Sequence, residues 1–227
     1  MIEGNQGKKA LLSIIGIAIL VVAVVGVTFA FFTYSRTGAT NNVITTGKVS
    51  FVFADNSFIT LTNHFPISTS DGLALSGTNN VCTFTVTGST STGTLNYAVW
   101  AIDGDSATTL NLTGSTTKFQ NSEVFVNITS TDVTGIAFTP STGIGGSSAA
   151  AISTLPTTAN NVGTVPANAH LLGTGTVTAR SDATRSFTVK MWVDSSVVTV
   201  GETGATYTPG QYGTLYYTMK IAVTAAQ

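Results

Sequence analysis

The chain has 227 residues, a formal net charge of −1 and only 8% charged residues. Near neutrality argues against a nucleic-acid-binding protein, which usually carries a basic patch or stripe, and against strong steering toward acidic membranes or charged substrates. Beyond the first thirty residues, the length suits one β domain with a core of its own. Thr, Ser, Gly and Asn fill most polar positions, a composition typical of strands and turns rather than helices.

A hydrophobic segment stands near the start of the chain. Lys8 and Lys9 precede the run ALLSIIGIAILVVAVVGVTFAFF, which only small or weakly polar residues interrupt. A positive region, an apolar region and a small-residue site are typical of a secretory signal peptide. Since Thr28 and Ala30 supply the small residues, we predict cleavage between Ala30 and Phe31.

Two other interpretations of residues 1–30 remain open. The apolar run is close to the ~20 residues that span a bilayer, so an uncleaved signal anchor would hold residues 10–30 in the membrane. A pilin-type leader is the third interpretation, although the acidic residue usual near the start of such a helix is missing. The lysine pair favours a cytoplasmic amino terminus. Cleavage and anchoring therefore both place residues 31–227 outside the membrane, at the cell surface or beyond.

Period-two alternation of apolar and polar residues recurs along the rest of the chain and predicts half-buried antiparallel strands. The alternating apolar positions are Val49, Phe51 and Phe53; Cys82, Phe84 and Val86; Leu95, Tyr97 and Val99; Val124, Val126 and Ile128; Phe187, Val189, Met191 and Val193; and Leu215, Tyr217, Met219, Ile221 and Val223. Turn sequences separate them at 70–72, 89–93, 103–105 and 208–210. We predict an all-β fold, an antiparallel, jelly-roll-like β-sandwich over residues 47–227.

Two further features complete the domain. Residues 139–168 break the rhythm with Gly, Ser, Ala, Thr and Pro, and we interpret them as a long surface insertion. Cys82 is the only cysteine, so the chain has no intrachain disulfide. Its place in an alternating run indicates a buried structural thiol.

Motifs of catalysis and cofactor binding are missing from the sequence. His64 and His170 lie far apart without HExxH spacing, and no nucleophile elbow, phosphate loop or dinucleotide fingerprint occurs. Asp103 and Asp105 are weak candidates for Ca²⁺ ligands, but the twelve-residue calcium loop is absent and Asp-Gly favours a hairpin turn. NLT at 111 and NIT at 127 match the glycosylation sequon, as chance often gives in a Thr-rich chain.

The junction between the hydrophobic segment and the polar domain reads VTFAFFTYSRTGATNNVITTGKVSF. A Thr-aromatic-Ala step, an aromatic pair, a polar stretch and a Gly-led strand follow one another, at Thr28–Ala30, Phe31–Phe32, Asn41–Asn42 and Gly47 onward. This order resembles the signal-peptide boundary and first strand of the TasA/camelysin family of secreted bacterial proteins. LTNHFPISTSDG, CTFTVTGSTSTGTLNYAVWAI and FTVKMWVD resemble later segments of the same family.

The resemblance implies a jelly-roll-like sandwich, export through a dedicated signal peptidase, and assembly into extracellular matrix fibres. It also implies that a strand near the mature amino terminus is donated to a neighbouring subunit, where Phe31, Phe32 and Tyr34 would be buried. Residues 31–46 would then form the donor strand and its linker. The alternative is that these aromatics form the interfacial belt of an anchored helix. Some family members are labelled metalloproteases, but this chain has no recognisable zinc motif.

The sequence therefore predicts a secreted structural subunit of a biofilm-matrix fibre. Its expected partners are other copies of itself and, during export, the signal peptidase; membrane contact is expected only through residues 10–30 before cleavage. No enzyme activity, cofactor or nucleic-acid partner is expected. A membrane-anchored monomeric surface adhesion or binding module, or a pilin-like subunit, is the alternative.

Overall fold

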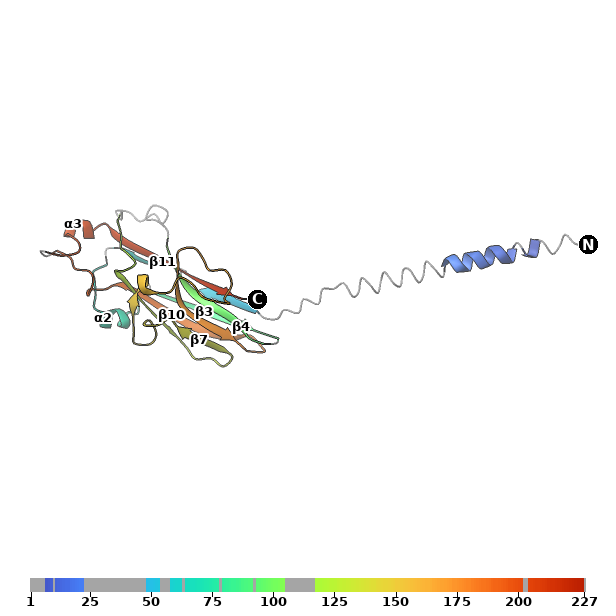
Figure 1. The fold of residues 1–227 in the computed structure, drawn as a ribbon, viewed down its shortest axis with the longest axis horizontal. Helices are drawn as coiled ribbons and strands as arrows, with labels where there is room; N and C mark the ends of the chain where they lie inside the picture. The colour runs from blue at the N-terminus through green and yellow to red at the C-terminus, as the bar shows by residue number, and fades with distance from the viewer. Residues whose placement is uncertain are drawn as a thin grey trace, which may run out of the picture. The chain divides into compact units, whose positions relative to one another are not determined.

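The computed structural model describes residues 7–9, 11–22, 48–53, 58–62, 64–77, 79–91, 93–104, 117–201 and 204–226 (Figure 1). For residues 48–53 and Phe58 it describes the backbone alone. The chain divides into two compact units, Met1–Ile44 and Thr45–Gln227.

The first unit contains a helix with an apolar surface. Residues 7–9 and 11–22 are helical. The large apolar side chains of residues 11–22 are all exposed, from 48% at Ile15 to 72% at Val22. None of the helices in the described ranges combines the length and the apolarity that crossing a membrane needs.

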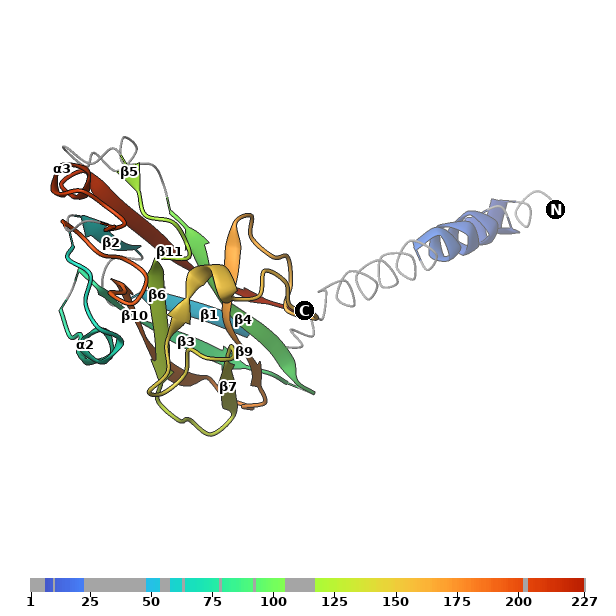
Figure 2. The ribbon, with the colours of Figure 1, turned by 60° about the vertical axis from the view of Figure 1, so that its left-hand side comes forward.

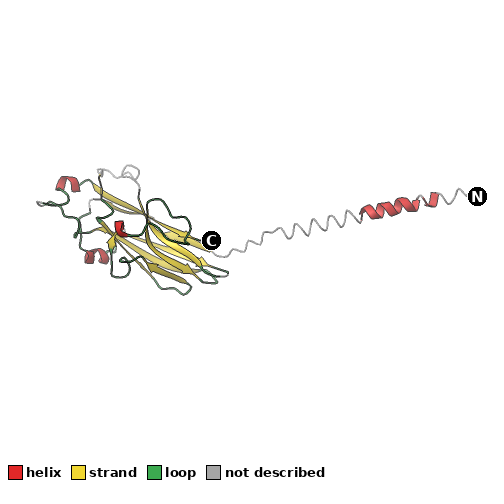
Figure 3. Ribbon diagram, viewed as in Figure 1, coloured by secondary structure: helices red, strands yellow, loops and turns green. Residues whose placement is uncertain are grey.

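The second unit is a sandwich of two sheets, which Figures 2 and 3 show from two sides. Sheet A has the strand order β1 (Lys48–Phe53), β3 (Val81–Ser89), β10 (Ala183–Val193), β6 (Val124–Ser130) and β8 (Ala150–Ala151). Sheet B has the order β2 (Phe58–Thr62), β11 (Leu215–Ala225), β4 (Leu95–Asp103), β9 (Ala169–Val177) and β7 (Ile136–Pro140). β5 (Thr117–Lys118) pairs with β11 in parallel, and the other named pairs are antiparallel. The predicted antiparallel β-sandwich is confirmed.

The core lies between the two sheets and is made by the alternating residues that the sequence predicted. On β3, residues 81–89 alternate between half-buried and buried along the whole strand, and Cys82 is 1% exposed. Phe84 stacks on Phe187 of β10 with ring centroids 4.9 Å apart, and Phe138 of β7 meets Phe187 edge-on at 4.9 Å. These rings tie sheet A to sheet B, because Phe138 comes from the opposite layer.

Glycines in β9 make room for the aromatic rings of sheet B. A Cβ on Gly175 would lie 2.4 Å from the Tyr97 ring, and one on Gly173 would lie 2.4 Å from the Phe138 ring. The Tyr97 ring lies over Gly175, and its hydroxyl donates to the Ala137 carbonyl at 3.0 Å. Only glycine permits so close an approach of ring and backbone.

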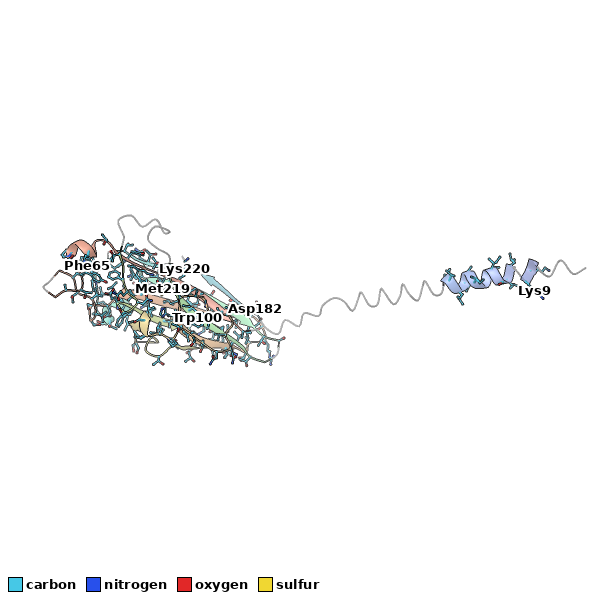
Figure 4. The ribbon with its side chains drawn as sticks, turned by 45° about the horizontal axis from the view of Figure 1, so that its top comes forward. Lys9, Phe65, Trp100, Asp182, Met219 and Lys220 are labelled. Carbon is cyan, nitrogen blue, oxygen red and sulfur yellow. The ribbon has the colours of Figure 1, made fainter. Side chains whose placement is uncertain are left out.

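The segment 139–168, predicted as a surface insertion, contains β8 and a short 3₁₀ helix, η1 (Ile152–Thr154). Val162 from this segment joins Ala98, Trp100 and Leu171 in a second small core on the outer face of sheet B. Trp100 is fully buried there and donates from Nε1 to the Thr224 hydroxyl at 2.8 Å (Figure 4). The segment therefore covers one face of the sandwich with packed side chains.

Two predicted turns form short helices, α2 (Thr69–Ala74) and α3 (Pro209–Tyr212). Ser68 caps α2, because its hydroxyl accepts a hydrogen bond from the Asp71 N–H at 3.2 Å. Thr208 and Gln211 form a capping box at α3, with proline in its first turn. The sequence at 70–72 and 208–210 thus reverses the chain by one helical turn rather than by a β-turn.

Two buried carboxylates, Asp194 and Glu123, form hydrogen bonds that stabilise the connection between β10 and β11. Asp194 is 0% exposed and accepts hydrogen bonds from Trp192 Nε1 at 2.9 Å and from the Thr69 hydroxyl at 2.8 Å. Glu123 is 7% exposed and accepts from the Tyr207 hydroxyl at 2.7 and 2.8 Å. These contacts hold α2 and the loop after β10 against the sandwich.

Candidate functional site

A sheet can accept a further strand only at an unpaired edge, and the outermost strands of the two sheets are β1, β8, β2 and β7. At the β6 margin of sheet A, β8 pairs with part of the strand, and the Ile128 N–H donates to the Ile144 carbonyl at 2.9 Å. Asn127 is 1% exposed and donates from Nδ2 to three carbonyls of residues 144–148, at 2.8 to 3.1 Å. This margin is covered, and the sequon at 127 is buried.

The β7 margin of sheet B is short and partly occupied. β7 has five residues and ends at Pro140, which has no N–H to offer. The Ile136 carbonyl accepts a hydrogen bond from Arg185 Nη1 at 2.7 Å, and the Ala137 carbonyl accepts from Tyr97. Proline and engaged carbonyls make a poor template for a further strand.

At the opposite margin of sheet B, the described strands cover only part of β11. β4 and β5 pair with one side of β11, at 219–225 and 215–216. On the other side, β2 pairs with Tyr216–Lys220, and no described strand pairs with Ile221–Ala225. We call Ile221–Ala225 the open edge. Figure 4 labels Met219 and Lys220, the last two residues of β11 that β2 covers.

The hydrogen-bond pattern shows which residues face the open edge. The Ala226 N–H donates to the Asn96 carbonyl of the β4 side at 3.0 Å. Since alternate residues of a strand point their N–H and C=O groups to opposite sides, Ile221, Val223 and Ala225 direct theirs away from β4, toward the open edge. No residue of the open edge is charged. Gly163 lies against the Ala225 end, where a Cβ on it would be 2.5 Å from the Ala225 carbonyl oxygen. An apolar extended segment could therefore pair with Ile221 and Val223 without burying an unpaired charge.

The residues predicted for signal cleavage and assembly are Ala30, Phe31, Phe32 and Tyr34. They lie outside the described residues, as does Asp105.

The hairpin turn predicted after Asp103 is wrong. At the end of β4, one side pairs with Met219 of β11, and on the other side the Asp103 N–H donates to the Asn168 carbonyl at 3.1 Å. Neither side is left for a hairpin partner, and the next described strand, β5, pairs with β11. The Asp103 carboxylate instead forms an ion pair with Lys118.

A polar cavity of about 370 Å³ adjoins Asp103. It is lined by Asp103, Asn121, Thr157, Pro166, Asn168, Ala169 and His170. The Tyr217 hydroxyl donates to Asn121 Oδ1 at 2.7 Å, and Asn121 Nδ2 lies 3.3 Å from His170 Nε2. Burial, and secondarily the Asp103 charge, raise the pKa of Tyr217, so its hydroxyl keeps the proton that it donates. No sequence pattern predicts this cluster, because its members are far apart along the chain.

Within the described part of the chain, no group of three or more His, Cys, Asp or Glu side chains is placed to hold a metal ion. His64 lies apart from the polar cavity, and burial lowers the pKa of its ring. Comparison with known protein families, with characterised proteins and with solved structures finds no match to the chain.

Proposed function

We propose that the chain is a structural subunit of an extracellular fibre that assembles when a neighbouring copy adds a strand to the open edge of β11. The observation that carries the proposal is that, among the described strands, Ile221–Ala225 of β11 pair with β4 on one side and with none on the other. Strand addition supplies backbone hydrogen bonds, and alternate side-chain positions fix the register. The covered β6 margin and the proline-terminated β7 margin are poorer templates for a further strand.

The donor in this proposal is residues 31–40, FFTYSRTGAT. Five paired residues need about 17 Å of extended chain, and ten residues supply about 33 Å. The segment has no proline and only one charged residue, Arg36. Each buried ring of Phe31, Phe32 or Tyr34 would contribute about 1.5–3 kcal/mol to the contact by area. Residues 41–46 then form the link to the donor's own domain.

The order of the strands supports the finer, jelly-roll-like assignment. In chain order β1, β2, β3, β4, β6 and β7 alternate between sheets A and B. The neighbours β2-β11-β4-β9 face β3-β10-β6 across the core. Repeated crossing between two antiparallel sheets is the pattern of a jelly roll.

Export is part of the same proposal. The exposed apolar side chains of residues 11–22 fit a signal peptide that is removed between Ala30 and Phe31, which would leave residues 31–227 outside the cell. The same helix also favours the second function, a membrane-anchored monomeric surface adhesion or binding module. That function requires the mature protein to retain residues 1–30 and to form no polymer.

Val223→Pro tests the proposed function, because it removes one N–H from the open edge and leaves the N–H groups that face β4. Ala222→Pro is the matched control, since its N–H faces β4 and its loss should unfold or destabilise the sandwich. We expect the secreted wild-type chain to begin at Phe31 by intact mass and to form fibres by electron microscopy. The Val223→Pro chain should fold, by circular dichroism, and remain unpolymerised.

Normal fibres from folded Val223→Pro protein would refute strand addition at the open edge. A wild-type chain that retains residues 1–30 and stays monomeric would instead support the anchored module.

A further inference from the structure

The burial of β11 decreases where its pairing with β2 ends. The residues from Leu215 to Met219 are all buried, in the part of the strand that β2 and β5 flank. Val223 and Ala225 pack against the same core, but both are only half-buried. Alternate residues of a strand point to the same face, so these two side chains point toward the core as Met219 does. The described residues therefore cover the core only in part beneath the open edge.

The open edge is limited at both ends. At one end β2 begins, with Phe58 opposite Lys220. At the other end lies Gly163, where a Cβ would be 2.5 Å from the Ala225 carbonyl oxygen. Val162, the residue before this glycine, is 2% exposed in the small core on the outer face of sheet B, which fixes the position of the loop. A strand that pairs with β11 here has room only between these two limits.

Ile221 and Val223 are the residues between the limits whose N–H and C=O groups face the open edge. Both side chains lie on the core face of sheet B. Residues directly opposite each other in an antiparallel pair have their side chains on the same face of the sheet. An added antiparallel strand therefore directs two side chains toward the core, two residues apart in its sequence, and directs the residue between them outward.

We propose that the open edge accepts the strand of a neighbouring copy in one register, with Phe32 and Tyr34 directed toward the core. Phe31 and Thr33 then lie on the outer face of sheet B. This inference rests on the proposed function and specifies which donor side chains the acceptor recognises. Phe32 and Tyr34 are the two aromatic residues of the segment 31–40 that are two positions apart.

The alternative registers place polar groups in the apolar site. A shift by one residue would direct Phe31 and Thr33 toward the core, and the threonine hydroxyl would lose its water. A shift by two residues would direct Tyr34 and Arg36 toward the core and bury an unpaired charge. The contact that buries both rings is therefore favoured over its neighbours in either direction.

Single substitutions to aspartate along the donor segment test the register in the full secreted chain. Phe32→Asp and Tyr34→Asp should each raise the concentration needed for fibre formation at least about tenfold, because each directs a charge toward the core. Phe31→Asp and Thr33→Asp are the matched controls and should change that concentration little. Intact mass verifies that all four chains begin at residue 31. Equal effects at the four positions, or larger effects at 31 and 33, would overturn the proposed register.

Insertions give an independent test of the spacing between the two rings. One alanine inserted between Thr33 and Tyr34 puts the rings on opposite faces of the added strand. One alanine inserted between Asn41 and Asn42, in the link, leaves their spacing unchanged. With both sandwiches folded by circular dichroism, the first chain should form no fibres and the second should assemble like the wild type. Normal fibres from the first chain would refute the register but not strand addition, whereas a wild-type chain without fibres would refute both.

Discussion

The indole of Trp192, the next-to-last residue of β10, donates a 2.9 Å hydrogen bond to the carboxylate of Asp194, two residues further along the chain. The same carboxylate accepts from the Ser196 N–H at 2.9 Å and the Ser196 hydroxyl at 2.6 Å, and Thr69 adds a contact from the base of α2. No cation takes part among these donors. A buried negative charge at the end of sheet A is therefore stabilised by oriented dipoles alone.

Replacing this carboxylate should destabilise the domain. Asp194→Asn removes the charge and turns an amide NH₂ group toward donors that need an acceptor. We expect a loss of about 1.5–3 kcal/mol in the free energy of unfolding, the usual value of hydrogen bonds to a charged group. Urea denaturation measures it, with exposed Asp71→Asn as the control, for which we expect less than about 1 kcal/mol. Equal effects of the two variants would contradict the role of Asp194.

The same residue predicts a pH dependence. Burial by itself raises the pKa of Asp194, but hydrogen bonds from Ser196, Trp192 and Thr69 outweigh it and lower the pKa below the usual value. The folded state therefore binds this proton less readily than the unfolded chain. The stabilisation is complete above the unfolded value of about 3.9 and is lost as the pH falls through the lower folded value. The stability difference between wild type and Asp194→Asn should shrink over that acidic range; a constant difference would contradict the shift.

Gly72 lies against the same indole, and its substitution should displace α2. A Cβ on Gly72 would lie 2.1 Å from Cε2 of Trp192, which is 1% exposed. Gly72→Ala should cost about 1–3 kcal/mol by overpacking and shift tryptophan fluorescence to longer wavelength. Gly77→Ala is the matched control, because its Cβ would meet nothing within 4 Å. If both substitutions leave fluorescence and stability unchanged, α2 does not depend on this contact.

The sequence predicted the strands that bury one face and expose the other. β3 keeps a strict period of two, and β10 keeps it as far as Met191, so these residues could be assigned to faces from the pattern alone. At the end of β10 the period is lost, because Trp192 is buried on the other face against Gly72 of α2. The alternation of apolar and polar residues did not predict strand β9, and the structure shows why. Gly175 stands opposite Tyr97 and Phe138, and Gly173 stands opposite Val99, so neither position shows an apolar side chain. A register shift between Val99 and Trp100 also interrupts the alternation.

The open edge could not be predicted from the sequence. Ile221 and Val223 alternate like core residues of any strand, and nothing local indicates that the described residues of β2 cover β11 only as far as Lys220. The polar cavity beside Asp103 could not be predicted from the sequence either. Asp103 and His170 were recognised one at a time, but strand pairing between β4 and β9 brings their neighbourhoods together.

The prediction that the protein has no proteolytic activity can be tested by an assay. The sequence has no zinc-peptidase motif, and His64 and His170 belong to separate sites of the described chain. Purified mature protein should therefore show no casein cleavage that EDTA removes. The control is His64→Ala protein prepared in the same way, which separates intrinsic activity from a contaminating protease. If EDTA removes casein cleavage and the His64→Ala variant also lacks it, the protein is a metal-dependent protease and the prediction is wrong.

A charge in the donor segment should weaken assembly without affecting the domain. Phe32→Asp would place an unpaired carboxylate in an apolar slot, which is costly unless a partner is present. We expect the concentration needed for fibre formation to rise, by light scattering, while the melting temperature of the monomer stays the same. Asn42→Asp adds the same charge to the polar linker and should assemble normally. A lowered monomer melting temperature for Phe32→Asp would place Phe32 in its own domain's core.

Removing residues 31–40 tests the donor segment as a whole. The buried core of the sandwich is assembled from residues 59–221, so the shortened chain should keep its circular dichroism spectrum and cooperative melting. It should not polymerise, because loss of two or three buried rings removes several kcal/mol, about 1.5–3 kcal/mol each, from every subunit contact. Added peptide 31–40 should bind the shortened monomer, whereas the peptide with Phe32→Asp should not. Normal fibres from the shortened chain would refute strand donation, and unfolding would show that the segment completes its own domain.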